Sequence, residues 1–162
     1  MTDWQDVAYH RSMAAETELK TGQIRDLSSP GAILGFRVAD VTDLIPKIEQ
    51  GFPYATFANF VSASGMLISE ATRLLGIPER TLARRKESKR LTPAESERLW
   101  RLSNLVELAF QLFEGDRDAA RRWLSTPKKA LRHQSPLQFA RTEIGAREVE
   151  KLIGRMEQGV FS

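Results

Sequence analysis

Apolar residues recur at helical spacing through most of the chain from about residue 41 onward. No stretch alternates convincingly between apolar and polar residues with the period of two that marks a β-strand. The first forty residues are mostly polar and weakly periodic, apart from a short helix expected near residues 6–19. The pattern therefore predicts an all-α protein preceded by an N-terminal arm, residues 1–40, whose order the sequence does not fix.

The first two predicted helices follow this arm. Asp40 or Thr42 can cap a helix that runs through Ile48 and ends at Gly51. Residues 54–62 then place apolar side chains at helical spacing, so we expect a second helix there.

The next segment predicts two short helices separated by a tight turn. Apolar positions in residues 67–75 share one helical face, and Gly76 follows as a C-terminal stop. Pro78 suits the first turn of a new helix that extends to about Lys86, with Leu82 facing inward. Helix, glycine turn and helix form the skeleton of a helix-turn-helix.

A long helix is expected next, because Thr92, Pro93 and Glu95 form a capping-box start. Its apolar residues make two stripes down to Phe113, before Gly115 ends it. Such a helix either packs against both halves of the protein and joins them, or uses one stripe in an oligomer interface.

Three further helices are predicted in the C-terminal part. Asp116 caps the first, Ser135 starts a short second one, and the third lies near residues 146–158. Trp123, Leu124 and Phe139 are expected in the core, whereas the apolar tail 160–162 either folds back or inserts into a partner. We therefore divide the chain into a helix-turn-helix domain, residues 41–104, and a small C-terminal helical domain, residues 105–162.

Composition argues against several functional classes. The 162 residues include no cysteine, and no apolar run is long enough to cross a membrane. The start of the chain carries no secretory signal, so a cytoplasmic protein is expected. His10 and His133 lack metal-ligand spacing, and no phosphate-binding loop or nucleophile elbow is present. We expect neither an enzyme nor a bound cofactor.

Charge is unevenly distributed along the chain. The net charge is +3, yet residues 79–90 alone carry +4, and residues 116–162 also carry +4. Residues 1–78 and 91–115 are net negative, at −3 and −2. The first basic run coincides with the second helix of the predicted helix-turn-helix, the helix that enters the DNA major groove in such domains.

The candidate DNA contacts lie on and just after that helix. Arginine can form two hydrogen bonds to the edge of a guanine base, and threonine and lysine commonly contact phosphates. The predicted DNA-binding residues are Arg80, Thr81, Arg84, Arg85, Lys86, Lys89 and Arg90. The alternative is that the turn merely joins two helices of a bundle, with the arginines solvated.

Several motifs resemble the Xre/MbcA/ParS-type antitoxins that are paired with RES-domain toxins. In the N-terminal half they are residues 51–53, 75–78, 80–85 and 91–99, which resemble an Xre-like helix-turn-helix. In the C-terminal half they are residues 109–115, 119–124, 126–127, 130–131, 135–137, Gly145 and residues 159–160, which resemble the family's toxin-binding domain.

This resemblance implies a function. The partner would be a RES-domain toxin that consumes NAD, encoded beside this gene, and the antitoxin would dimerise within a larger complex and repress its own operon by binding operator DNA. Its C-terminal end would cover the toxin's active site. Carried onto this sequence, the toxin-binding residues are Arg147, Lys151, Arg155, Glu157, Gln158, Val160, Phe161 and Ser162.

Two other interpretations remain open from the sequence. One is a stand-alone dimeric transcriptional regulator whose C-terminal helices dimerise or bind an effector. The other is an enzyme, which would require NAD turnover by the isolated chain.

Overall fold

The computed structural model describes residues 30–159, and this part of the chain is all-α, as predicted. Its only β-structure consists of two isolated bridges. The short helix expected near residues 6–19 and the tail 160–162 lie outside the described residues. The elements are η1 (Ala32–Leu34), α2 (Val41–Gln50), α3 (Tyr54–Ser64), α4 (Ile68–Leu75), α5 (Glu79–Ser88), α6 (Pro93–Leu112), α7 (Arg117–Ser125), η2 (Lys129–Leu131), α8 (Pro136–Phe139) and α9 (Glu143–Glu157).

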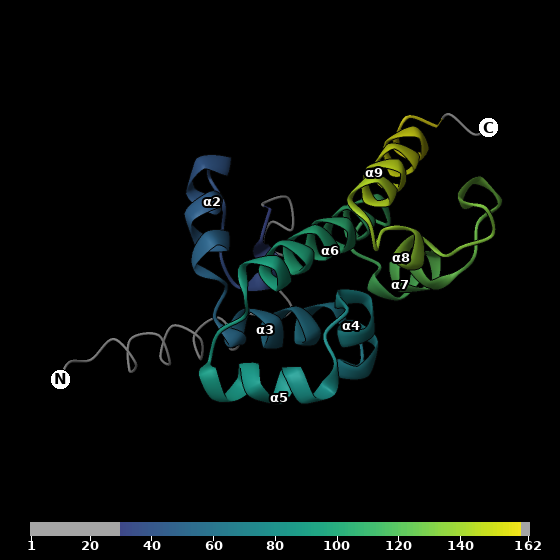
Figure 1. The fold of residues 1–162 in the computed structure, drawn as a ribbon. Coiled ribbons are helices and arrows are strands. Elements are labelled where there is room, and N and C mark those ends of the chain that lie inside the picture. Colours follow the sequence, from purple (N-terminus) through teal and green to yellow (C-terminus); the bar gives the residue numbers. More distant parts are fainter. Residues whose placement is uncertain (1–29, 160–162) are drawn as a thin grey trace.

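The 20-residue helix α6 is the spine of the fold. It contacts α2, α3 and α4 of the N-terminal half and α7 and α9 of the C-terminal half, with α2 toward one end of the molecule and α9 toward the other (Figure 1). Leu99, Leu105 and Phe110 are completely buried along its length. The two apolar stripes of this helix therefore join the two halves of the protein, as the first interpretation of the sequence predicted.

Side-chain caps set the helix starts that the sequence predicted. The Asp40 carboxylate accepts a hydrogen bond from the Thr42 backbone N–H, and Asp116 accepts one from Ala119. Thr92 and Ser135 each form a complete capping box with a proline at the next position. Each cap satisfies a backbone donor that the first turn of a helix leaves unpaired.

The last helix begins three residues earlier than the sequence pattern predicted. Thr142 is its cap and accepts a hydrogen bond from the Gly145 N–H at 3.0 Å. The pattern missed this start because Glu143 and Ile144 lie on the outer face, and the buried stripe begins only at Gly145 and Ala146.

Part of the stretch that was assigned to the N-terminal arm is firmly packed. Ile33 and Leu34 are buried in the core, and the Glu107 carboxylate of α6 accepts hydrogen bonds from the Gly31 and Ile33 N–H groups at 3.1 and 2.9 Å. Burial raises the pKa of Glu107, although these N–H donors oppose the shift. The buried carboxylate thus fixes residues 31–34 against the spine.

Candidate DNA-binding and toxin-binding surfaces

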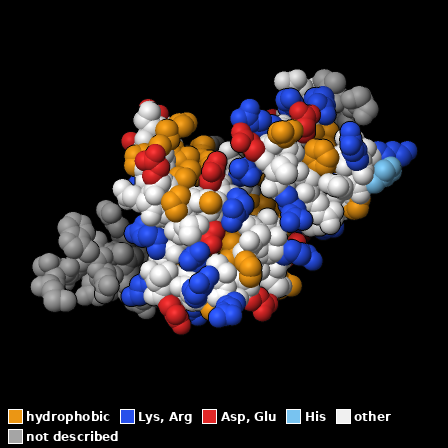
Figure 2. All heavy atoms as spheres, viewed as in Figure 1, with side chains coloured by type: hydrophobic (Ala, Val, Ile, Leu, Met, Phe, Trp, Pro, Cys, Tyr) orange, Lys and Arg blue, Asp and Glu red, His pale blue; other side chains and the backbone are white. Residues whose placement is uncertain are grey.

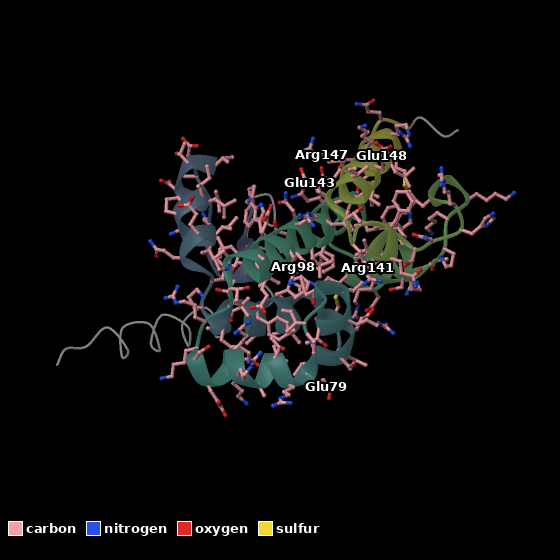
Figure 3. All side chains as sticks on the ribbon, viewed as in Figure 1. Glu79, Arg98, Arg141, Glu143, Arg147 and Glu148 are labelled. Carbon is pink, nitrogen blue, oxygen red and sulfur yellow. The ribbon has the colours of Figure 1, made fainter. Side chains whose placement is uncertain are left out.

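The helix-turn-helix consists of α4, a three-residue turn and α5. Gly76 takes the left-handed conformation, with φ of 63°, and the buried Ile77 anchors the turn in the core. The Arg98 guanidinium of α6 donates a hydrogen bond to the Leu75 carbonyl at 2.7 Å and so holds the end of α4 (Figure 3). This contact fixes the turn, and with it the direction in which α5 leaves.

Helix α5 lies on the surface of the molecule and has no buried residue (Figure 1). Lys and Arg side chains gather over it (Figure 2). Arg80 and Arg84 are exposed and share one helical face, because they are four residues apart. Lys86 and Lys89 are also exposed, and Thr81 is half-buried.

Arg85 is placed differently from the other residues of the basic run. Its Nε donates to both carboxylate oxygens of Glu95, at 2.8 and 3.1 Å, and its side chain is only 22% exposed. Glu95 in turn accepts a hydrogen bond from the Thr92 N–H, which completes the capping box of α6. Arg85 therefore ties the predicted recognition helix to the start of the spine.

The charge of Glu95 depends on this contact. Desolvation works to raise its pKa, but the hydrogen bonds from Arg85 and Thr92 outweigh it, so the pKa of Glu95 lies below its ordinary value. The carboxylate is thus ionised at neutral pH and available to hold Arg85.

Arg90 also contacts the protein itself. Its guanidinium donates to the Gly51 carbonyl, and the neighbouring backbone is paired through the Leu91 N–H and the Phe52 carbonyl at 2.8 Å. In contrast, the side chains of Arg80, Arg84, Lys86 and Lys89 make no ion pair or hydrogen bond within residues 30–159. The seven predicted DNA contacts therefore divide into cations with free head groups, a half-buried threonine and two arginines that hold the domain together.

The outer face of α9 carries three of the predicted toxin contacts. Arg147, Lys151 and Arg155 repeat every four residues and are all exposed, opposite the face that Val149 and Ile153 bury against the core. Arg147 pairs with Glu143 (Figure 3), and Lys151 pairs with Glu148 at 2.8 Å. Glu157 and Gln158 are exposed at the end of the helix, and Val160, Phe161 and Ser162 lie outside the described residues.

Ile144, which the sequence pattern did not single out, lies on this same face. Its side chain is 78% exposed, and it precedes Arg147, Lys151 and Arg155 by three, seven and eleven residues. An exposed isoleucine bordered by cations can supply an apolar contact to a partner. The signal that could have revealed it is its position outside the buried stripe of α9.

Residues 30–159 contain no group of three or more His, Asp or Glu side chains that could hold a metal ion. No helix among them is both long enough and apolar enough to cross a membrane.

Comparison with known protein families assigns both halves of the chain. Residues 43–104 match the antitoxin Xre-like helix-turn-helix domain. Residues 108–159 match the antitoxin Xre/MbcA/ParS C-terminal toxin-binding domain. The first match contains α5, and the second contains the whole of α9.

Individual relatives agree with this assignment. Antitoxin Xre of Yersinia enterocolitica is 38% identical over 156 residues, which cover 96% of this chain and 99% of the relative. Antitoxin Xre of Photorhabdus laumondii is 32% identical over 80% of this chain and 88% of the relative. Antitoxin Xre of Pseudomonas putida is 37% identical over 70% of each chain. The chain therefore belongs to the Xre family of antitoxins and combines a helix-turn-helix with a toxin-binding domain.

Proposed function

We propose that this antitoxin neutralises a RES-domain toxin that consumes NAD and is encoded by the adjacent gene. It does so by binding, and it has no catalytic activity of its own. In this proposal the outer face of α9 binds the toxin, and the chain beyond Gly159 reaches the toxin's active-site cleft. NAD and operator DNA are both cytoplasmic, so the protein acts in the cytoplasm.

The observation that carries this proposal is the exposed face of α9. Ile144 supplies an apolar contact, while Arg147, Lys151 and Arg155 surround it with cations. This combination of an apolar centre and a charged rim is the usual anatomy of a protein interface. A cleft that binds the pyrophosphate of NAD would attract the cation nearest the end of the helix, Arg155.

A second activity belongs to α5. We propose that Arg80 and Arg84 contact base edges in the operator, whereas Lys86 and Lys89 contact phosphates. Arg85 and Arg90 act as positioning residues, because their guanidinium groups are already bound to Glu95 and Gly51. The antitoxin would thereby repress its own operon.

We further propose that the chain dimerises, because helix-turn-helix proteins commonly bind the two half-sites of an operator as dimers. Helix α2 offers an apolar surface for this purpose, since Val41 is 67% and Ile45 is 51% exposed. Light scattering on the purified chain gives the mass directly, and a monomer at micromolar concentration would contradict dimerisation.

The test of the toxin proposal is co-expression with the adjacent open reading frame, with an affinity tag on that neighbour only. We expect growth to be rescued and a stable complex to be recovered. The informative variant is Ile144→Asp, which should lose both results, and its matched control is Ile68→Asp, an exposed isoleucine on α4.

The outcomes separate the competing interpretations. A neighbour that is neither toxic nor bound would favour a stand-alone regulator, and operator binding would then define the function. If the Ile144→Asp variant forms the complex as well as the wild type, the outer face of α9 does not contact the toxin. Circular dichroism of both variants verifies that the fold is retained.

A further inference from the structure

The longest acid-free stretch in the C-terminal half has no part in the surfaces described so far. Residues 119–142 contain six Lys and Arg residues and no Asp or Glu, a net charge of +6. The surrounding segment 116–162 carries only +4, because its six acidic residues lie at the two ends. Charge is thus concentrated around the loop that joins α7 to α8, residues 126–134.

This loop has a defined conformation held by its own backbone. The Lys128 N–H donates to the Gln134 carbonyl at 3.0 Å, and the His133 N–H donates back to the Lys128 carbonyl at 2.9 Å. Leu131 is 3% exposed and anchors the loop in the core. The Lys128 ammonium lies over the Trp123 ring, 5.6 Å from its centroid. The loop is therefore preorganised.

Two consecutive residues of the loop adopt the left-handed conformation, Arg132 with φ of 53° and His133 with φ of 61°. This region disfavours residues with a Cβ; glycine usually occupies it, and Asn, Asp and His are the most enriched of the other residues. Both side chains, together with Lys129, are exposed and make no hydrogen bond or ion pair within residues 30–159. Lys129 and Arg132 therefore present cationic head groups that nothing in residues 30–159 pairs, and Arg132 does so from a backbone conformation that a β-carbon disfavours.

The position of the loop separates it from the DNA-binding surface. It projects at the end of the molecule that carries α7 and α9, far from α5 (Figure 1). Lys and Arg side chains are also visible over this end (Figure 2). Since the groove-reading helix is at the other end, the observations favour a protein partner over DNA.

We propose that the loop 126–134 is an electrostatic docking element that binds an acidic patch on the toxin. This inference rests on the proposed function, because it assigns a second contact to the same toxin-binding domain. Lys129 and Arg132 supply the fixed positive charge, and the loop's rigidity lowers the entropy lost on binding. Charges at the rim of an interface act mainly on the association rate.

The experiment measures toxin association with the double variant Lys129→Gln/Arg132→Asn. Asparagine tolerates the left-handed conformation, so the thermal midpoint should equal or exceed that of the wild type. We expect the association rate to fall by about tenfold at low ionic strength, with a smaller difference at high salt. The rate should be retained in Arg132→Lys.

The matched control is Lys86→Gln/Lys89→Asn in the helix-turn-helix domain. It removes the same charge, and Lys89 is also left-handed, with φ of 58°. Its toxin association should match that of the wild type, whereas its operator affinity should fall. Both double variants are measured as full chains against the co-purified toxin and against operator DNA.

Each remaining outcome overturns the proposal in a recognisable way. An unchanged association rate in the loop variant would show that the loop does not meet the toxin. Loss of operator affinity in the loop variant, with toxin binding intact, would make the loop a DNA contact. A wild-type chain that does not bind the toxin would overturn the proposed function, and the loop proposal with it.

Discussion

The contact between Arg85 and Glu95 gives the sharpest prediction about the helix-turn-helix. Arg85→Ala removes a guanidinium that donates to both oxygens of a carboxylate whose side chain is only 7% exposed. A hydrogen bond to a charged group contributes about 1.5–3 kcal/mol. Glu95 keeps its bond from the Thr92 N–H, and Arg85 is partly solvated, so we expect a loss near the middle of that range, about 2 kcal/mol.

Thermal unfolding followed by circular dichroism measures this loss. For a chain of this length about 2 kcal/mol corresponds to a fall in Tm of about 4–8 °C. The matched control Arg84→Ala removes an exposed arginine that pairs with nothing in residues 30–159, and its free energy of unfolding should change by less than about 0.5 kcal/mol.

The effect of pH provides a second check on the same contact. Because the folded pKa of Glu95 is lowered, its stabilisation is present above the ordinary pKa of glutamate and is lost as pH falls through the folded value. The difference between wild type and Arg85→Ala should therefore shrink in acid. A variant that melts like the wild type at pH 7, yet binds operator more weakly, would refute the assignment of Arg85 as a positioning residue.

Three further predictions concern stability and DNA binding. Glu107→Ala leaves two buried N–H groups without an acceptor and should cost about 1–3 kcal/mol in urea unfolding. Burial raises the pKa of Glu107 in the folded state, so its protonated form is the one that favours folding. The stability of the wild type relative to Glu107→Gln should therefore fall as the pH rises from the unfolded-state pKa through the folded-state pKa. The opposite trend would be inconsistent with burial. Gly145→Ala brings a Cβ against the Phe139 carbonyl and should lower the free energy of unfolding by about 1–3 kcal/mol. Its control, Gly154→Ala, places the Cβ in open space and should be neutral or slightly stabilising. Equal effects of the two substitutions would argue against a close approach at Gly145. Arg80→Ala should weaken operator binding by about 1–3 kcal/mol in fluorescence anisotropy with Tm unchanged, and full affinity would remove it from the DNA surface.

The helical architecture was predictable because its signals are local. The caps at Asp40, Thr92, Asp116 and Ser135 each depend on residues within one turn, and all four form as expected. The two apolar stripes of α6 likewise follow from periodicity alone, and their burial against both halves confirms the helix as the link between them.

The roles of individual surface residues depended on contacts between distant segments. Arg85 and Arg90 look like the other members of the basic run, and only the tertiary structure brings them to Glu95 and Gly51. Ile144 looked like an ordinary apolar residue before the start of a helix, until its exposure placed it on the outer face of α9. Periodicity identifies which faces are buried, but it does not show what an exposed side chain contacts.

We propose that toxin and DNA bind separate surfaces of this antitoxin. Hydrogen–deuterium exchange on the free chain, on its complex with the toxin and on its complex with operator DNA tests this directly. The toxin should protect α9 and the loop 126–134 and leave α5 unchanged, whereas the operator should protect α5 and the turn before it. Protection of α5 by the toxin, or no change in α9, would contradict the account.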